Sequence, residues 1–253
     1  MNKVAIVTGS SSGIGAATAL ELSRRGWSVV VNYSKSAAEA QQVADRCKEG
    51  GQDAIAVQAD VAQDADCRRL LKAALDKWGR LDALVNNAGT TKFVAHAKLD
   101  DLSADDFLRI YRVNVVAAFQ MTRACAAALK SSRGAVVNVG SVASFLGTGS
   151  SIAYAASKGA VNTLTMSLAR VLGPEIRVNA VLPGFVDTPW MTAGYGPERY
   201  KELATRYAGN APLKSTCKPE DIAETIAWLV EGGKMITGET VFVDAGIHIA
   251  TPR

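Results

Sequence analysis

The clearest chemical signal in the sequence is a glycine-rich turn near the amino terminus, where residues 8–15 read TGSSSGIG. Gly9 allows a tight turn with positive φ, Gly13 has no Cβ to keep a pyrophosphate from the backbone, and Gly15 lets a helix pack close to a strand. The exposed N–H groups and the positive end of the helix dipole would then face phosphate. The spacing G-x3-G-x-G differs from the common G-x-G-x-x-G fingerprint, and such a turn can also be a plain structural loop. Its position at the first strand–helix junction favours a nucleotide site.

The end of the second predicted strand bears on which dinucleotide would bind. A site for NAD usually places Asp or Glu about 20 residues after the glycine turn, where the carboxylate holds the ribose 2′-hydroxyl. Residues 31–36 read VNYSKS and contain no acid that would repel a 2′-phosphate. Lys35, Asn32 and the serines at 10, 11 and 34 could bind such a phosphate. We therefore favour NADP(H) over NAD(H), although Lys35 taken alone could equally be a solvated residue before a helix.

Further polar residues follow two other predicted strands. The segment 86–89 reads NNAG and follows the fourth strand, and Ser141 ends the fifth. Tyr154 and Lys158 are four residues apart near the start of a predicted helix, so they lie on one helix face. A Tyr-x3-Lys pair alone means little, because ordinary helix surfaces contain many. Its significance comes from the motifs that accompany it.

Together these motifs make the chain similar to the short-chain dehydrogenase/reductase family. The matching features span nearly the whole chain in the family's order: TGSSSGIG at 8–15, Asp60, NNAG at 86–89, Asn114, Ser141, Tyr154 with Lys158, and Pro183-Gly184 with Thr188. The pattern most resembles 3-oxoacyl-[acyl-carrier-protein] reductases, although sugar and polycyclic-ketone reductases share it. Two departures are small: Gly140 stands where many members have serine, and Ala245 where many have glycine.

The resemblance implies catalytic roles for four residues. Tyr154 would give a proton to a carbonyl oxygen as hydride arrives from the nicotinamide, or remove one from an alcohol. Lys158 would bind the nicotinamide ribose and, with the positive nicotinamide, lower the tyrosine pKa from its usual value of about 10. Ser141 would hydrogen-bond the substrate oxygen. Asn114 would anchor a water that links Lys158 to solvent.

The resemblance also implies a wider set of cofactor contacts. Asp60 and Val61 match the pair that meets the adenine, and residues 183–188 match the turn that holds the carboxamide. The full expected set is Gly9, Ser11, Ser12, Gly13, Ile14, Gly15, Asn32, Tyr33, Ser34, Lys35, Asp60, Val61, Asn87, Ala88, Gly89, Tyr154, Lys158, Pro183, Gly184, Val186 and Thr188.

The elements that must position these residues alternate along the chain. Apolar runs rich in Val, Ile and Ala predict strands at 3–8, 27–33, 53–59, 82–86, 134–140, 175–181 and 239–243. Amphipathic segments predict helices at 14–25, 36–49, 63–78, 103–131, 150–173 and 219–231. This alternation predicts an α/β fold of the Rossmann type, with a doubly wound parallel sheet of about seven strands and helices on both faces. We expect one domain over residues 1–253.

Residues 190–212 depart from the alternation and are expected to form a helical flap over the substrate. The candidate pocket walls are Trp190, Met191, Tyr195, Tyr200 and Tyr207, with Ser141, Ser144, Phe145 and Leu146 opposite. These aromatic side chains could instead form the packed core of the flap. The expected substrate is a small carbonyl compound or alcohol, with an acyl thioester as one candidate.

Composition excludes several other classes of protein. The chain has 253 residues, of which 48% are hydrophobic and 21% charged, as in ordinary globular proteins. Its net charge of +4 is scattered, which argues against nucleic-acid binding. The four cysteines and two histidines lack metal-ligand spacing, so we expect reduced thiols and no metal site. No signal peptide or long apolar run is evident, so we expect a cytoplasmic protein without a membrane segment.

The resemblance further implies a homotetramer, with the helices at 103–131 and 150–173 forming one interface and the last strand and tail another. The alanine-rich face at 124–128 would permit close contact with a second copy, or equally burial against its own sheet. Two alternatives to an NADP(H)-dependent carbonyl reductase stay open at this point. One is an NAD-dependent alcohol or sugar dehydrogenase on the same scaffold. The other is a non-enzymatic nucleotide sensor, which the presence of Ser141, Tyr154 and Lys158 disfavours.

Overall fold

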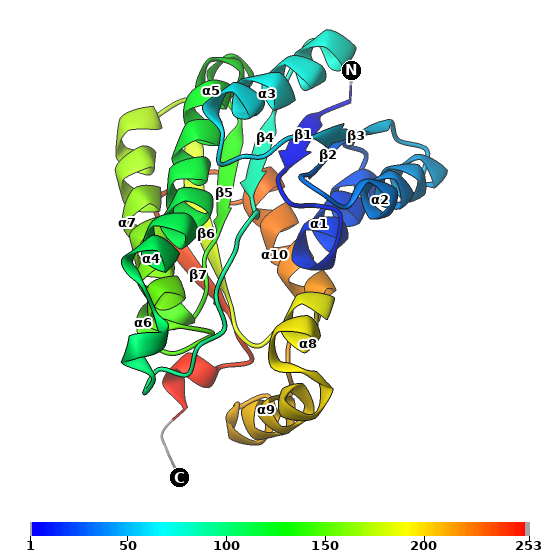
Figure 1. Ribbon diagram of the computed structural model, residues 1–253. Coiled ribbons are helices and arrows are strands. Elements are labelled where there is room, and N and C mark those ends of the chain that lie inside the picture. Colours follow the sequence, from blue (N-terminus) through cyan, green and yellow to red (C-terminus); the bar gives the residue numbers. More distant parts are fainter. Residues whose placement is uncertain (1, 251–253) are drawn as a thin grey trace.

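Seven short apolar segments form one parallel sheet within residues 2–250, the part of the chain that the computed structural model describes (Figure 1). The strands are β1 (Val4–Val7), β2 (Ser28–Tyr33), β3 (Ala54–Gln58), β4 (Ala83–Asn86), β5 (Ala135–Val139), β6 (Arg177–Pro183) and β7 (Thr240–Val243). Their order is β3-β2-β1-β4-β5-β6-β7, with every neighbouring pair parallel. All seven predicted strands are confirmed, with ends shifted by at most two residues.

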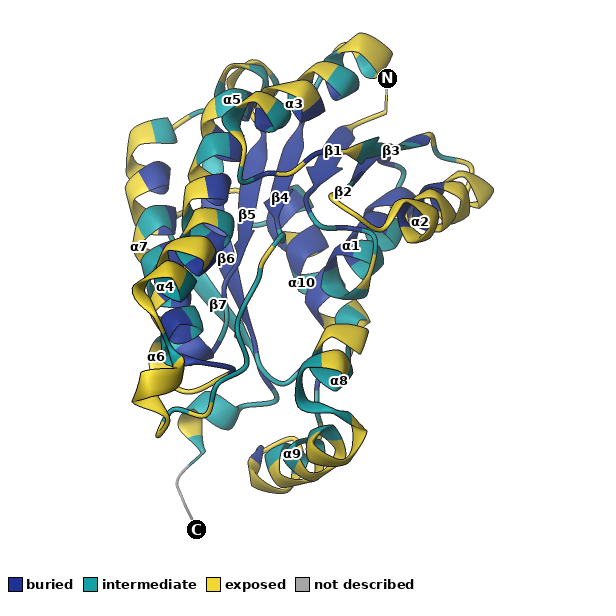
Figure 2. Cartoon of the chain, viewed as in Figure 1, coloured by how far each residue is buried: buried dark blue, intermediate teal, exposed yellow. Residues whose placement is uncertain are grey.

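Helices cover both faces of this sheet, as the predicted fold class requires. One face carries α1 (Gly13–Arg24), α2 (Ala37–Glu49) and α10 (Pro219–Glu231). The other carries α3 (Asp64–Trp78), α4 (Ala104–Tyr111), α5 (Ala117–Ser132), α6 (Ala143–Leu146) and α7 (Ile152–Leu172). Each face has its own apolar core, and the central strands are buried between them (Figure 2). Strands enclosed on both sides cannot alternate polar and apolar residues, which explains their continuous apolar sequences.

The predicted helix at 103–131 is wrong in one respect, because a π-helical turn (Arg112–Val116) divides it into α4 and α5. Its start is as expected: Ser103 caps α4, with its Oγ accepting from the Asp106 N–H at 3.2 Å, while Asp106 accepts from the Ser103 N–H at 3.0 Å. The π turn contains Asn114. Such turns are frequent at functional sites.

The flap predicted at 190–212 consists of two helices, α8 (Pro189–Tyr195) and α9 (Pro197–Asn210). They lie at the carboxyl end of the sheet, beyond β6 (Figure 1). Neither helix contains a fully buried residue. The flap therefore covers the end of the sheet without being part of either core.

The sheet order reverses direction between β1 and β4, and this places four loops at one edge. Gly9 follows β1, Asn87 follows β4, Ser141 follows β5 and Gly184 follows β6. In open parallel sheets, ligands bind in the crevice at such a reversal. The topology therefore brings the predicted phosphate turn and the predicted catalytic serine to the same end of the molecule.

All four cysteines are buried and none forms a disulfide, which agrees with the expectation of reduced thiols. Burial raises the pKa of the Cys47, Cys67 and Cys217 thiols to about 11. Within residues 2–250, no helix has the length and apolar character needed to cross a bilayer.

Candidate active site

The glycine turn after β1 has the conformation that phosphate binding needs. Gly9 and Gly13 adopt left-handed φ angles of 60° and 55°. A Cβ at Gly15 would overlap the Gly9 carbonyl oxygen and lie 2.5 Å from Asn87 Nδ2. That amide nitrogen donates to the carbonyl oxygens of Thr8 and Gly9, at 2.9 and 3.0 Å. No side chain caps α1 and its first turn contains no carboxylate, so its N–H groups are available to an anion.

Asn32 supports this turn from β2. Its Oδ1 accepts from the Gly9 N–H at 3.0 Å, and its Nδ2 donates to the Ala59 carbonyl oxygen at 3.0 Å. The neighbouring Ser10 Oγ donates to the Val7 carbonyl oxygen at 2.7 Å and accepts from the Asn32 N–H. Both side chains are buried and bonded to backbone. Asn32 and Ser10 hold the turn, so they are no longer candidates to bind a 2′-phosphate. Ser34 and Lys35 are exposed and remain candidates.

A groove of about 710 Å³ runs from Lys35 and Asp60, past the glycine turn, to Tyr154 and Lys158. The expected cofactor residues that line it are Gly9, Ser12, Gly13, Ile14, Asn32, Ser34, Lys35, Asp60, Val61, Asn87, Ala88, Gly89, Tyr154, Lys158, Pro183, Gly184, Val186 and Thr188. Three expected residues do not line it: Gly15 is buried behind the turn, Tyr33 packs against the core, and Ser11 lies outside. The groove also has walls that the motifs did not predict, among them Thr90 and Arg109. Its phosphate cradle and its span fit a nicotinamide dinucleotide.

Tyr154 and Lys158 lie on the first turns of α7, which Ser151 caps by accepting from the Tyr154 N–H at 3.2 Å. Lys158 is only 4% exposed, and its ammonium donates to the Val139 carbonyl oxygen at 2.7 Å. The same Nζ lies 5.6 Å from the centre of the Tyr154 ring. The helical spacing thus brings a phenol and an ammonium together at the end of β5, as the sequence predicted.

Burial dominates the protonation of this pair. It raises the pKa of Tyr154 to about 12, against the opposing effect of the Ser141 hydroxyl, and it lowers the pKa of Lys158 to about 8. We expected the Lys158 ammonium, with the positive nicotinamide, to lower the pKa of Tyr154. The protein groups alone do not produce this decrease. The physical reason is that Lys158 bonds to Val139 and lies over the ring face, so desolvation of the phenol is the larger effect. At neutral pH these groups hold Tyr154 as a neutral phenol, the form that can donate a proton.

Asn114 connects the π turn to both neighbouring segments. Its Nδ2 donates to the Thr90 carbonyl oxygen and to Ser157 Oγ, at 3.0 and 2.9 Å, and its Oδ1 accepts from the Thr90 N–H at 2.8 Å. Both amide hydrogens are therefore already used inside the protein. The side chain fixes the loop after Gly89 against α7, and only the backbone or the remaining lone pair of Asn114 could serve the expected water.

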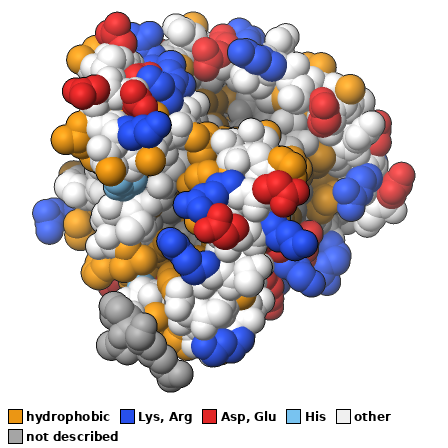
Figure 3. Space-filling model, turned by 60° about the horizontal axis from the view of Figure 1, so that its bottom comes forward, with side chains coloured by type: hydrophobic (Ala, Val, Ile, Leu, Met, Phe, Trp, Pro, Cys, Tyr) orange, Lys and Arg blue, Asp and Glu red, His pale blue; other side chains and the backbone are white. Residues whose placement is uncertain are grey.

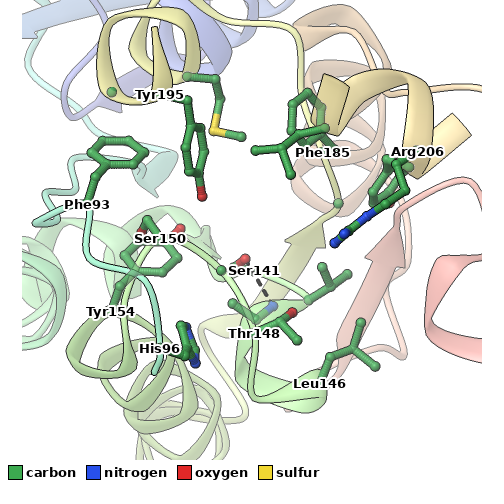
Figure 4. Close-up of a pocket in the computed structure, with 18 of the residues that line it drawn as sticks. Phe93, His96, Ser141, Leu146, Thr148, Ser150, Tyr154, Phe185, Tyr195 and Arg206 are labelled. Carbon is green, nitrogen blue, oxygen red and sulfur yellow. Dashed lines mark hydrogen bonds between the residues drawn. The ribbon is translucent and has the colours of Figure 1, made fainter. Parts of the chain in front are cut away.

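A second cavity, of about 880 Å³, opens under the flap (Figure 4). Trp190, Met191, Tyr195, Tyr207 and Leu146 line it as expected. Ser141 and Tyr154 line both this cavity and the groove, so the two spaces meet at these side chains. Figure 3 turns this end of the molecule toward the viewer and shows apolar side chains beside a hollow, with charged side chains near them.

Two expected substrate residues, Ser144 and Phe145, do not line the cavity. Ser144 Oγ donates to the Ser141 carbonyl oxygen at 2.6 Å and accepts from Asn162 Nδ2 at 2.9 Å. Phe145 is 69% exposed and packs edge-to-face on Phe242, with ring centres 5.2 Å apart. The short helix α6 turns both side chains away. Tyr200 is also outside the cavity, because its hydroxyl donates to Asp187.

The sequence of this chain is similar to those of known reductases. A family model described as enoyl-(acyl carrier protein) reductase matches residues 9–248. A protein of Streptomyces violaceoruber, assigned as ketoacyl reductase 2 of the granaticin polyketide synthase, is 41% identical over 247 residues, which are 97% of this chain and 96% of that protein. The 3-oxoacyl-[acyl-carrier-protein] reductase FabG of Staphylococcus aureus is 36% identical over 251 residues, 98% and 99% of the two chains. This chain belongs to the short-chain dehydrogenase/reductase family.

A solved structure assigned as a short-chain dehydrogenase/reductase from Burkholderia xenovorans matches the fold with a TM-score of 0.91 and 42% identity, covering 98% of this chain and 99% of that one. As a short-chain dehydrogenase/reductase, the protein is an oxidoreductase that uses NAD(P) and acts on an alcohol or carbonyl. Gly140, where the chain departs from the family pattern, is closely packed against β6. A Cβ there would overlap Leu182 and lie 3.2 Å from the Val181 carbonyl oxygen.

Several cavity residues of this short-chain dehydrogenase/reductase were not foreseen. Phe93 packs against Tyr195 and Trp190, with ring centres 4.8 and 5.4 Å apart, and Gly194 leaves the room that its ring occupies. Phe93 follows the NNAG segment closely, and its position in that loop could have suggested it. Thr148 and Arg206 also line the cavity, and no motif marked either of them.

Proposed function

We propose that this protein is an NADPH-dependent ketoreductase that reduces a ketone of the 3-oxoacyl type to a secondary alcohol. The observation that carries the proposal is the meeting of two cavities at Ser141 and Tyr154. A dinucleotide in the groove would have its nicotinamide at the Lys158 end, between Tyr154 and Thr188. A ketone under the flap would then lie beside it, with its oxygen toward the two hydroxyl groups.

The chemistry of the chain's own side chains suits reduction. Bound NADPH would supply the hydride. Tyr154, held as a neutral phenol, would donate its proton to the carbonyl oxygen, and Ser141 would hold that oxygen in line. Lys158 would be mostly cationic at pH 7, since its pKa is about 8, and would stabilise the phenolate that forms. A dry, partly enclosed site strengthens each of these interactions.

Three features support NADPH as the dinucleotide. Ser34 and Lys35 line the far end of the groove and are exposed there. No acid occurs at the end of β2 to hold a ribose 2′-hydroxyl. Asp60, which does line the groove, uses Oδ1 to accept from the Ala62 N–H at 3.0 Å. The Lys35 ammonium, with no acid beside it at the end of β2, favours the additional phosphate of NADPH.

A carbonyl is a better substrate for this site than a carbon–carbon double bond, although the matching family model is described as an enoyl reductase. Two hydroxyl groups, from Ser141 and Tyr154, border the place where the cavities meet. They suit an oxygen that accepts a hydrogen bond and then a proton. The two relatives described above have names that specify ketoacyl or 3-oxoacyl reduction, which supports the same choice.

We further propose a cytoplasmic homotetramer. Buried, unpaired cysteines suit a reducing compartment. Large apolar side chains are exposed on the outer helices that would form the interfaces. They include Val116 on the π turn, Phe119 on α5, and Met166 and Val171 on α7. Such side chains gain stability when a second copy covers them. Light scattering after size-exclusion chromatography measures the assembly.

A substrate screen tests the proposed activity. Purified protein is mixed with 3-oxoacyl, 2-enoyl and simple ketone substrates, each with NADPH and with NADH, and cofactor absorbance is followed. We expect NADPH-dependent reduction of the 3-oxoacyl substrate and no reduction of the enoyl one. Equal rates with NADH would refute the cofactor assignment, and preferential reduction of the enoyl substrate would refute the carbonyl assignment.

A further inference from the structure

The substrate cavity has an unusual balance of charge. Its walls are mainly apolar and aromatic, and they include two arginines, Arg199 and Arg206, but no aspartate or glutamate. A charged group beside an apolar cavity becomes costly when a ligand displaces the surrounding water, unless the ligand provides a partner. The charges of these two arginines therefore bear on which substrates the cavity accepts.

The two arginines differ in how their charges are matched. Arg199 Nη1 forms an ion pair with Glu202 Oε2 at 2.6 Å, one turn along α9. Arg206 forms no ion pair or hydrogen bond within residues 2–250, and its side chain is exposed. Figure 4 shows its guanidinium pointing from α9 into the space that Phe185, Ser141 and Tyr154 surround. One unmatched positive charge thus faces the place where a substrate would lie.

The next residue in the chain, Tyr207, anchors the helix that carries Arg206. Tyr207 donates its hydroxyl proton to the Asp244 carbonyl oxygen at 2.6 Å, which ties α9 to the end of β7. Gly184 makes this contact possible, because a Cβ there would overlap the Tyr207 hydroxyl. Leu203, Tyr207 and Asn210 face the cavity from the same helix. The turn of α9 that carries Arg206 is therefore anchored at one wall of the cavity, while Ser141 and Tyr154 lie at another.

We propose that Arg206 binds an oxyanion of the substrate, so that the preferred substrate is a ketone that carries a carboxylate or phosphate away from its carbonyl. This proposal rests on the ketoreductase function proposed above. Arginine suits the role because its planar guanidinium pairs with either anion through two hydrogen bonds. The anion could belong to a small keto acid or to the phosphopantetheine arm of a thioester, and the chemistry is the same in both.

The test compares matched charged and neutral substrates. One arm uses a series of keto acids of increasing length and their methyl esters. The other uses 3-oxobutanoyl-phosphopantetheine, which carries a phosphate, and 3-oxobutanoyl-N-acetylcysteamine, which does not. In at least one arm, we expect the unmodified enzyme to show a kcat/KM for the charged substrate roughly tenfold or more above that for the neutral one. The arm with the larger ratio identifies the source of the anion.

The variant Arg206→Gln should bring that ratio close to one, mainly through a higher KM for the charged substrate, while the Kd for NADPH stays the same. Arg206→Lys should retain part of the preference. Arg46→Gln removes the same charge from an exposed position on α2 and should leave the ratio unchanged. Because Arg206 is exposed, added salt should reduce the preference of the unmodified enzyme.

The outcomes separate the two proposals. An enzyme that reduces neutral and charged ketones equally well would keep the ketoreductase function and overturn the role of Arg206. A preference that survives in Arg206→Gln would also overturn it. If no ketone is reduced with either cofactor, the proposed function itself fails.

Discussion

Replacing Lys158 by methionine removes a buried ammonium but keeps the length of the side chain. Burial lowers the pKa of this lysine from 10.5 to about 8. At ~1.36 kcal/mol per pKa unit, the folded state is disfavoured by about 3 kcal/mol below pH 8, where the lysine is protonated in both states. As pH rises from 8 toward 10.5, the folded protein loses this proton before the unfolded chain does. The cost is then relieved, so Lys158 makes stability increase with pH in that window.

Urea unfolding of the unmodified protein and of Lys158→Met, measured at intervals from pH 7 to pH 10, gives the difference in the free energy of unfolding. We expect this difference to change by about 2–3 kcal/mol in favour of the unmodified protein over that range. The buried cysteines and tyrosines also titrate at alkaline pH, but they occur in both proteins and cancel in the difference. The variant should also lose most turnover.

Lys234→Met is the matched control, because it removes an exposed ammonium. It should follow the pH dependence of the unmodified protein. If Lys158→Met follows it as well, the ammonium is not desolvated in the folded state, and the account of the Tyr154–Lys158 pair given above is wrong.

Three further variants test other parts of the site. Tyr154→Phe should lower kcat by about 10²–10⁴-fold with an unchanged Kd for NADPH, measured by fluorescence, because only proton transfer is lost; near-normal turnover would remove Tyr154 from its role. Lys35→Asp should shift the ratio of kcat/KM for NADPH and NADH toward NADH by roughly tenfold or more, and an unchanged ratio would mean that other groups hold the 2′-phosphate. Gly15→Val should abolish NADPH binding and lower Tm, since its side chain would collide with Gly9 and Asn87; binding measured by calorimetry that stays normal would contradict this.

The fold was predictable because its signals are local. The strands are mainly apolar segments of four to seven residues, and burial of the central strands on both faces favours this composition. The division of the helix at 103–131 was not predictable in the same way. Residues 112–116 carry no Gly or Pro that would mark an interruption, and the tertiary contacts of Asn114 with Thr90 and Ser157 within the π turn are not visible in the sequence.

The positions of candidate site residues were predictable where those residues belong to one turn or one helix. The position of the glycine turn between β1 and α1, and that of Tyr154 and Lys158 on one face of α7, follow from local sequence patterns. The substrate wall does not, because loops and helices that are distant in sequence build it. Ser144 and Phe145 are close to Ser141 in the chain but turn away from the cavity, whereas Arg206 reaches it from α9. The effect of burial on Tyr154 could not be predicted either, because sequence does not reveal how strongly desolvation raises the pKa of a phenol near an ammonium.

The buried amide of Asn32 has a consequence for how cofactor choice can change. This amide bonds to the Gly9 N–H in the loop after β1 and to the Ala59 carbonyl oxygen just after β3. Buried contacts therefore fix the shape of the phosphate-binding turn, referred to here as the cradle. The side chains at positions 34 and 35 are exposed and lie beyond that amide. Because Ser34 and Lys35 are the residues proposed above to favour NADPH, exchanging them should change the preferred dinucleotide while the cradle keeps its form. The residues proposed to select the dinucleotide are therefore distinct from the residue that shapes the phosphate-binding turn, although all of them lie at the end of β2.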